Sequence, residues 1–248
     1  MMELFEVNTK QGNTIEYYKK EADRNKIPVV LSMGNWEPAL RGFPLLNQIE
    51  DRTSVVLSYR GRGRSGSPDQ GYDWKDHSHD LEAVVEDCGF DKCIFIAFSK
   101  GVSYTLGYLE SNPEKACGLL LIDYPAIHCE SIKGYAEFWY NRTYKDFRLK
   151  DYVTRKALDG IERESTYRDF YPLIASIKCP VTLFVGRDDQ APIRSNVEIE
   201  DVEKYQKANP NIRIIEFTQS GHMILDDEPD KAYREVKKFL SGQQKPFC

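Results

Sequence analysis

Ile94-Phe95-Ile96-Ala97-Phe98-Ser99-Lys100-Gly101-Val102-Ser103 is an apolar run that ends abruptly at a serine between small residues. Such a run is typical of a buried strand that enters a tight turn just before a helix begins. Ala97 and Gly101 stand two positions before and two after the serine, where small side chains let the neighbouring backbone pass close to the turn. The stretch therefore predicts that Ser99 lies at a sharp strand-to-helix corner.

Two interpretations of this corner are open from the stretch alone. In the first, Ser99 is the nucleophile of a G-x-S-x-G elbow with alanine in its first place. In the second, Ser99 only caps the helix that follows. The rest of the chain has to decide between a chemical and a structural serine.

Length and composition limit the number of domains and the classes of partner that we expect. The chain has 248 residues, of which 41% are hydrophobic and 12% aromatic, which predicts one large domain with an insertion. A net charge of -5, with acidic and basic residues interspersed, offers no basic stripe for nucleic acid or a membrane surface. The start of the chain lacks the pattern of a signal peptide, so we expect a cytoplasmic protein with free thiols rather than disulfides.

Short apolar strands alternate with helical patterns along most of the chain. Residues 2–8 and 13–22 resemble an edge hairpin, and buried strands are predicted within 28–33, 54–59, 92–98, 116–124, 181–186 and 212–217. Helices are predicted within 38–49, 74–88, 100–110, 202–208 and 229–240. This alternation predicts an α/β fold with a mostly parallel, doubly wound sheet of about eight strands, whose sites lie at the carboxyl ends of the strands.

The alternation stops for about fifty residues after Tyr124. We therefore predict that residues 126–176 form a short helical cap, inserted into a core made of residues 1–125 and 177–248. This segment is rich in aromatic side chains: Tyr135, Phe138, Trp139, Tyr140, Tyr144, Phe147, Tyr152, Tyr167, Phe170 and Tyr171. Most of them should pack the cap onto the core, and we predict that Trp139, together with Trp36 of the core, faces a substrate.

Residues 60–68 form a glycine-rich loop with three arginines. The loop lacks the Gly-Lys-Ser/Thr ending of a phosphate-binding loop and does not run directly into a helix, which argues against a nucleotide site. Its arginines are interpreted as structural or solvated.

A nucleophilic serine needs a base, and His222 is the histidine best placed to be one. His77 and His79 stand at the start of a predicted helix, where capping and solvent exposure explain them, and His128 opens the insertion. His222 instead follows the last predicted strand, on the loop at its carboxyl end, where a base for Ser99 is needed.

Several carboxylates compete to orient His222. Asp188 and Asp189 follow the penultimate predicted strand, and Asp189 is favoured because the loop needs a residue or so to clear the strand. Asp123, which ends the strand before the insertion, is a third candidate, with a helix cap or a loop hydrogen bond as its structural interpretation. The predicted triad is Ser99, Asp189 and His222.

An oxyanion hole needs two backbone N–H groups aimed at the developing negative charge. One is expected from Lys100, directly after Ser99 at the start of the helix. The other is expected from the loop after the strand 28–33, at Asn35, with Gly34 as the alternative.

Five motifs now stand in an order that resembles the α/β-hydrolase superfamily over nearly the whole chain. Met33-Gly34-Asn35-Trp36 resembles its oxyanion motif, Tyr59 to Ser65 its Asp-x-Arg-G-x-G-x-S loop, and Ala97 to Gly101 its elbow, while Gly186 to Asp189 and Gly221-His222 resemble its acid and base loops. Met33 and Ser58 depart from the family's histidine and aspartate, and neither position transfers protons in that family.

The resemblance implies a serine hydrolase that cleaves a small-molecule ester, thioester or lactone without a metal or organic cofactor, as a monomer or homodimer. C–C hydrolases, amidases and cofactor-free haloperoxidases share this triad, and a non-catalytic ligand receptor on the same scaffold is the alternative of another class. Lys100 is unexpected, because a cation at a helix N-terminus is unfavourable by roughly 0.3–1 kcal/mol. Either its ammonium is solvated, or it faces the cleft and attracts anionic substrates.

Overall fold

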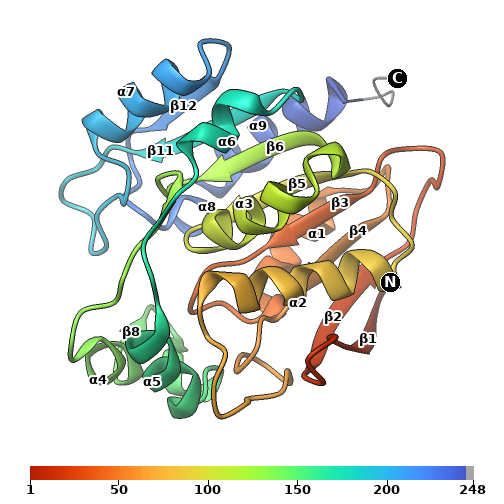
Figure 1. The fold of residues 1–248 in the computed structure, drawn as a ribbon. Coiled ribbons are helices and arrows are strands. Elements are labelled where there is room, and N and C mark those ends of the chain that lie inside the picture. The colour runs from red at the N-terminus through yellow and green to blue at the C-terminus, as the bar shows by residue number, and fades with distance from the viewer. Residues whose placement is uncertain (244–248) are drawn as a thin grey trace.

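The computed structural model describes residues 1–243, and its centre is an eight-stranded sheet in the order β1-β2-β4-β3-β5-β6-β11-β12 (Figure 1). The pairs β1–β2 and β2–β4 are antiparallel and the other neighbouring strands run parallel. This is the mostly parallel sheet that the alternation predicted. Its strands are β1 (Met2–Asn8), β2 (Thr14–Lys20), β3 (Val29–Ser32), β4 (Ser54–Leu57), β5 (Cys93–Phe98), β6 (Ala116–Ile122), β11 (Val181–Gly186) and β12 (Arg213–Phe217).

Helices cover both faces of this sheet, and most of them lie where helical spacing placed them. The helices of the core are α1 (Phe43–Gln48), α2 (Trp74–Asp87), α3 (Gly101–Ser111), α6 (Tyr171–Ser176), α7 (Ile199–Ala208), α8 (Ile224–Asp227) and α9 (Pro229–Ser241), with 3₁₀ turns η1 (Ala39–Gly42) and η2 (Pro113–Lys115). The helix predicted within 38–49 is therefore a 3₁₀ turn followed by a short α-helix.

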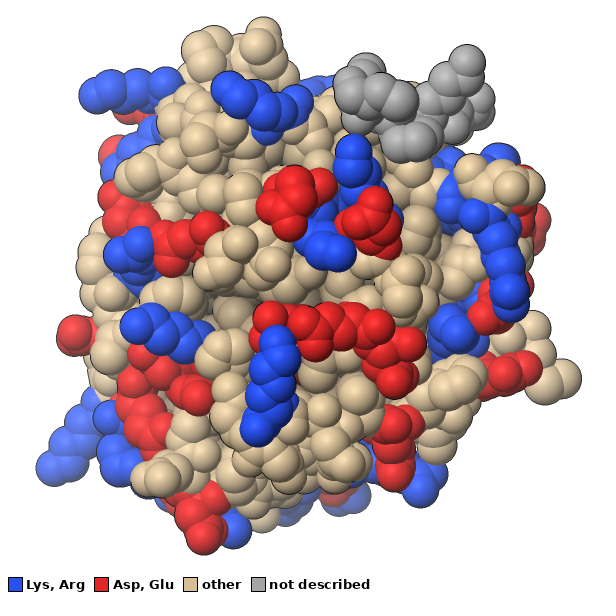
Figure 2. All heavy atoms as spheres, turned by 45° about the vertical axis from the view of Figure 1, so that its right-hand side comes forward, with Lys and Arg blue, Asp and Glu red and all other residues tan. Residues whose placement is uncertain are grey.

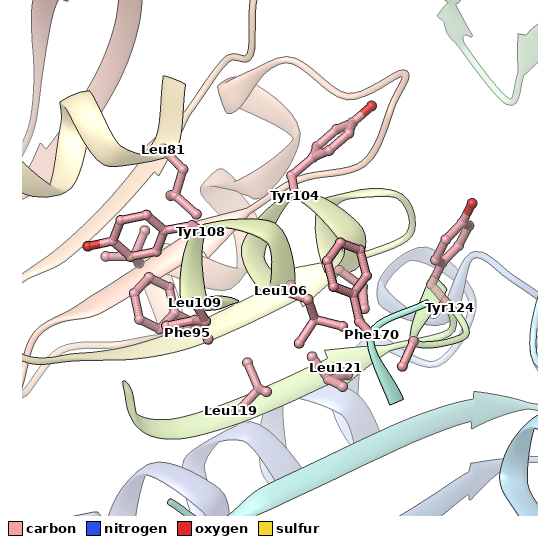
Figure 3. Close-up of a cluster of buried hydrophobic side chains, with 14 of the residues drawn as sticks. Leu81, Phe95, Tyr104, Leu106, Tyr108, Leu109, Leu119, Leu121, Tyr124 and Phe170 are labelled. Atoms are coloured by element: carbon pink, nitrogen blue, oxygen red, sulfur yellow. The ribbon is translucent and has the colours of Figure 1, made fainter. Parts of the chain in front are cut away.

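Strand β5 shows how one sequence fills two hydrophobic cores. Alternate side chains of a strand point to opposite faces, and β5 is apolar at every position because both faces are covered. Phe95 and Ala97 pack in the cluster under α2, α3, α6 and α7, where Figure 3 shows Phe95 among side chains from α2, α3 and β6. Ile94 and Ile96 pack in the opposite cluster under α1, α8 and α9.

The segment predicted as a cap divides into two parts. Its first part holds β7 (Ile127–His128), α4 (Tyr135–Tyr140), the hairpin β8 (Thr143–Tyr144) and β9 (Phe147–Arg148), η3 (Leu149–Asp151), α5 (Arg155–Glu164) and β10 (Arg168–Asp169). In Figure 1, α4 and α5 stand apart from the sheet, joined to it by two long chain segments. The second part, α6, packs against α7, and its Ile174 belongs to the core cluster. Within the predicted cap segment, α6 therefore packs with the core.

A third hydrophobic cluster joins this cap to the core. Leu149, Ala157 and Ile161 of the cap pack with Tyr72, which comes from the core loop before α2. Trp36 of the core packs against the same cluster. The cap therefore has an apolar base seated on two core loops.

The described surface carries mixed charge. Figure 2 shows lysines and arginines interspersed with acidic side chains on the face that it presents. Cys88, Cys93, Cys117, Cys129 and Cys179 are free thiols, as predicted, and Cys248 lies outside the described residues. Among residues 1–243, no helix is both long and apolar enough to cross a membrane.

Candidate active site

Ser99 sits at a strained corner between β5 and α3. Its φ is +55°, a left-handed conformation that costs a non-glycine residue energy and persists only where the surroundings impose it. Its N–H donates to the carbonyl of Ile122 at 3.0 Å. A Cβ added at Gly101 would lie 2.5 Å from the carbonyl oxygens of Ser32 and Met33, so only glycine fits there. The elbow predicted from the sequence has the expected shape.

His222 lies beside Ser99, on the loop between β12 and α8. Its Nε2 is 3.0 Å from Ser99 Oγ, and both side chains are buried, each residue being 5% exposed. The ring stacks on Phe98 with centroids 5.0 Å apart, and the backbone N–H donates to the carbonyl of Ile193 at 2.9 Å. Packing and backbone contacts therefore hold the imidazole next to the serine.

The carboxylate that pairs with His222 is that of Asp123, and not that of Asp189 as predicted. Asp123 Oδ2 lies 2.7 Å from His222 Nδ1, which places the Nδ1 proton toward the carboxylate and leaves Nε2 to accept the Ser99 hydroxyl proton. Asp123 is completely buried. Asp189 is exposed and Asp188 only partly buried, and within the described residues neither forms a hydrogen bond with His222.

The loop that was predicted to supply the acid instead supplies hydrogen-bond donors to Asp123. Its carboxylate accepts the Ser195 hydroxyl at 2.6 Å, the Asn196 N–H at 3.0 Å and the Gly186 N–H at 2.9 Å. With His222, four donors meet one carboxylate. This network holds Asp123 in the position from which it can orient the base.

Sheet order explains why Asp123 reaches the site. Strand β6 lies directly beside β5, so the residue after β6 emerges next to the residue after β5. Asp189 stands further along a loop that leaves the sheet. One sequence signal pointed this way: Asp123 follows the buried strand with no intervening residue, whereas Asp189 is separated from its strand by two.

Two glycines let the base loop approach the sheet. A Cβ at Gly186 would lie 2.0 Å from the carbonyl oxygen of Gly221, and one at Gly221 would lie 2.1 Å from the carbonyl oxygen of Ile193. Both distances are too short for any side chain. The glycines quoted in the acid and base motifs therefore serve close backbone packing around His222.

The predicted oxyanion residues flank Ser99. A Cβ at Gly34 would lie 2.7 Å from Ser99 Cβ, which shows how closely the loop after β3 approaches the elbow. The backbone N–H groups of Asn35 and Lys100 donate no hydrogen bond to another group within residues 1–243. Two unpaired donors beside a candidate nucleophile are what an oxyanion hole requires.

Arg62 anchors the oxyanion loop. It is fully buried, and its guanidinium donates to both the backbone carbonyl and the side-chain oxygen of Asn35. Tyr104 also donates to that side-chain oxygen, at 2.8 Å, while the Asn35 amide donates to Tyr135 of the cap, at 2.8 Å. Arg62 is therefore a structural arginine, which was one of the two interpretations of the loop's arginines. Its hydrogen bonds hold Asn35 in position.

His77 is also part of this buried anchor, so its interpretation as an exposed helix-start residue is wrong. Its Nε2 lies 2.9 Å from Arg62 Nη1, and its Nδ1 lies 2.8 Å from the carbonyl of Asp73. Burial and the neighbouring guanidinium lower the pKa of His77 well below its usual value. The neutral ring therefore accepts from Arg62 and donates to Asp73.

Lys100 is not solvated, because it is only 6% exposed. Its Nζ lies 3.5 Å from the carbonyl of Cys129 and 5.9 Å from the ring centroid of Tyr135, beneath the cap. Burial lowers the pKa of its ammonium to about 8. His128, also buried, has a pKa lowered to about 2 by burial and by the charge of Lys100.

Trp36 and Trp139 meet at the cap boundary. Their ring centroids are 4.5 Å apart, and both line a cavity of about 440 Å³ between the cap and the core. Met223, which follows His222, lines the same cavity. The two tryptophans predicted to face a substrate therefore border one cavity, which also reaches the residue after His222.

Comparison with known proteins extends this description. No family model matches the chain. Similar solved structures include an esterase from Rhodococcus sp. ECU1013, with a TM-score of 0.80, 18% identity, and coverage of 97% of this chain and 99% of that one. An enol-lactonase from Burkholderia xenovorans LB400 has a TM-score of 0.76 at 14% identity, with 96% and 100% coverage. A carboxylesterase from Bacillus subtilis has a TM-score of 0.72 at 16% identity, with 98% and 92% coverage.

These similarities define the class of fold. The chain has the α/β-hydrolase fold, as its resemblance to that superfamily implied. At such low identities a structural match speaks for the fold alone, and the chemistry has to be argued from the site.

Proposed function

We propose that this protein is a serine hydrolase that cleaves a small-molecule carboxylic ester, thioester or lactone through an acyl-enzyme intermediate. The observation that carries the proposal is the continuous hydrogen-bonded line from Ser99 through His222 to Asp123, with spacings of 3.0 and 2.7 Å. A serine in a strained turn with no such base behind it would be only a structural corner.

Acylation follows from this geometry. Ser99 Oγ attacks the substrate carbonyl carbon while its proton passes to His222 Nε2. The imidazolium that forms is stabilised by Asp123, and the carbonyl oxygen becomes an oxyanion within reach of the Asn35 and Lys100 N–H groups. The intermediate then collapses, and His222 returns the proton to the departing oxygen or sulfur.

Deacylation repeats these steps with water. His222 accepts a proton from a water molecule as that water attacks the acyl carbon, and then returns the proton to Ser99 as the acid product leaves. The buried position of both side chains and the cap above them limit the access of other water to the reacting atoms.

The test is ester turnover with a matched pair of serine variants. Ser99→Ala should lower kcat on 4-nitrophenyl butyrate by roughly 10⁵- to 10⁶-fold and abolish labelling by a fluorophosphonate probe. Ser103→Ala serves as the control, because Ser103 is buried in α3, the helix after Ser99, but bonds to His128 and the Lys100 carbonyl. Equal turnover by the wild type and Ser99→Ala would end this proposal. A thioester and a lactone in the same assay decide which bond is preferred.

A further inference from the structure

The cavity beside the triad has an apolar wall. Trp36, Phe138, Trp139 and Phe147 contribute aromatic rings to it, and three of these rings come from the cap. Its volume of about 440 Å³ suits a small organic molecule. Ser99 and His222 do not themselves line this cavity, but Glu37 does, and the position of a Cβ added at Gly34 lies 2.6 Å from Glu37 Oε2 and 3.1 Å from Ser99 Oγ, so the cavity wall reaches the elbow.

Three arginines line the same cavity, Arg41, Arg142 and Arg194, and the last two are exposed to solvent. Arg41 forms an ion pair with Asp226, although its buried Nε has no acceptor. Arg142 stacks over the ring of Phe138, with its Cζ 3.9 Å from the centroid. In the described part of the chain, neither Arg142 nor Arg194 has an acidic partner, so two positive charges at the cavity are uncompensated.

The acidic side chain that borders the cavity does not neutralise them. Glu37 is only 4% exposed, and its Oε2 has no hydrogen-bond partner among the described residues. A Cβ added at Gly34 would lie 2.6 Å from this oxygen and 3.1 Å from Ser99 Oγ, so the carboxyl group lies close to the elbow. Burial raises the pKa of Glu37, which favours its neutral form. The cavity therefore combines an apolar wall with net positive charge.

We propose that this cavity selects substrates that carry a carboxylate, with the apolar body of the substrate against the aromatic wall and the carboxylate at Arg142 and Arg194. This inference rests on the proposed ester hydrolysis and names the substrate class for it. An arginine offers a planar pair of donors that matches a carboxylate, and the stacking on Phe138 holds one of the two in place.

The first experiment compares two esters of one chain length. 4-Nitrophenyl hydrogen glutarate ends in a carboxylate, and 4-nitrophenyl pentanoate ends in a methyl group. The wild type should have the higher kcat/KM on the anionic ester. Arg142→Met and Arg194→Met should each lower the anionic-to-neutral ratio by roughly two- to fivefold, and the double variant should lower it by about the product. The ratio should also fall with added salt.

Arg148→Met is the matched control. Arg148 ends the hairpin of β8 and β9, and Arg142 directly precedes this hairpin. Arg148 is exposed, pairs with Asp151 and does not line the cavity. It should leave the ratio unchanged. An unchanged ratio in the Arg142→Met/Arg194→Met double variant would overturn the inference, while turnover of both esters would leave the hydrolase proposal standing.

A second measurement does not depend on turnover. Calorimetry on Ser99→Ala should detect tighter binding of 5-phenylpentanoate than of 5-phenylpentanamide, and the arginine double variant on the Ser99→Ala background should lose this difference. Equal binding of acid and amide to Ser99→Ala would also overturn the inference. If neither ester is hydrolysed by the wild type, the hydrolase proposal fails, and the calorimetry still decides whether the cavity prefers an anion.

Discussion

At the scale of single residues, Asp123 is the most constrained side chain of the candidate site after Ser99 and His222. It is fully buried, its φ is +51°, and four donors converge on its carboxylate. Strain of this kind is maintained only when the surroundings over-determine a position. Strand β6, the loop after β11 and the base loop all take part in that constraint.

A pair of isosteric variants tests the assignment of the acid. Asp123→Asn should reduce kcat by about 10⁴-fold on a neutral ester, because the amide cannot stabilise the imidazolium and favours the wrong tautomer of His222. Asp189→Asn should keep kcat within about twofold of the wild type, since Asp189 is exposed. Stopped-flow or steady-state assays of both variants measure this, with circular dichroism to check that each is folded. The reverse ranking of the two variants would restore Asp189 as the acid.

Glu37 is a buried residue next to the elbow that the sequence pattern did not predict. It stands between Trp36 and Pro38, where nothing about the spacing marks it as buried. The turn after Gly34 brings it against the elbow instead. Its position was determined by how closely two loops approach, and such an approach has no periodic signature.

At the scale of structural elements, the glycine-rich loop after β4 connects three parts of the molecule. Gly61 and Gly63 both have positive φ, and a Cβ at Gly61 would lie 2.3 Å from the Cβ of Ala157 in α5. The Gly61 carbonyl accepts from Thr154, and the Gly63 N–H donates to Tyr152, so the loop is bonded to the cap. Through Arg62 it also holds Asn35. The same loop therefore contacts the cap and holds Asn35, the predicted oxyanion residue.

Arg62→Lys tests that role without removing the charge. A lysine has no planar set of donors, so the bonds to the Asn35 carbonyl and side chain cannot both be kept. We expect kcat to fall roughly 10- to 100-fold with KM changed by less than about threefold, because a displaced oxyanion donor weakens binding of the transition state more than of the substrate.

Arg64→Lys in the same loop is the control, since Arg64 is exposed and should tolerate the change. Steady-state kinetics on one neutral ester give the kcat and KM values for both variants. Wild-type kcat in Arg62→Lys, or a rise in KM alone, would contradict a positioning role for this arginine.

At the scale of the whole molecule, a buried ammonium makes the stability of the fold depend on pH. Lys100 has a folded-state pKa of about 8, below its ordinary value of 10.5. Below pH 8 the lysine is charged in both states, and the folded state bears the full cost of burying the charge. Between pH 8 and 10.5 the unfolded state binds more protons than the folded state, so the Lys100 contribution to stability improves as pH rises.

Lys100→Met should therefore stabilise the protein at pH 7 by about 1–3 kcal/mol, because it keeps an apolar stem of similar length and removes the charge. The advantage over the wild type should shrink by pH 9.5. Urea unfolding of both proteins at the two pH values measures the difference. Burial raises the pKa values of cysteines and tyrosines such as Cys93 and Tyr59, and these groups lower the stability of the fold as pH rises. Their contributions are the same in both proteins and cancel in the comparison. A pH-independent difference would mean that packing, and not charge, is responsible.

Much of the architecture was predictable from the sequence because it follows from local patterns. Apolar runs such as Ile94–Phe98 mark strands covered on both faces, and the pairing of small residues around Ser99 marks the elbow. His222 was predictable because it follows the last strand, and parallel strands bring their carboxyl ends to one edge. Asp123 and Asp189 both met that criterion, and the one sequence signal that favours Asp123 is its position directly after a strand.

The sequence by itself thus determined the sheet, the strand-to-helix corner at Ser99 and the placement of His222 after the last strand, since each depends on periodicity or on the order of elements along the chain. Only the tertiary structure decided that Asp123 is hydrogen-bonded to His222, that Lys100 is buried, and that Arg142 and Arg194 line a cavity with aromatic side chains. These outcomes depend on which loops touch after the strands have been ordered β5-β6-β11. Contacts between loops distant in the chain are set by packing and side-chain pairing, and those energies arise only when the whole domain has folded.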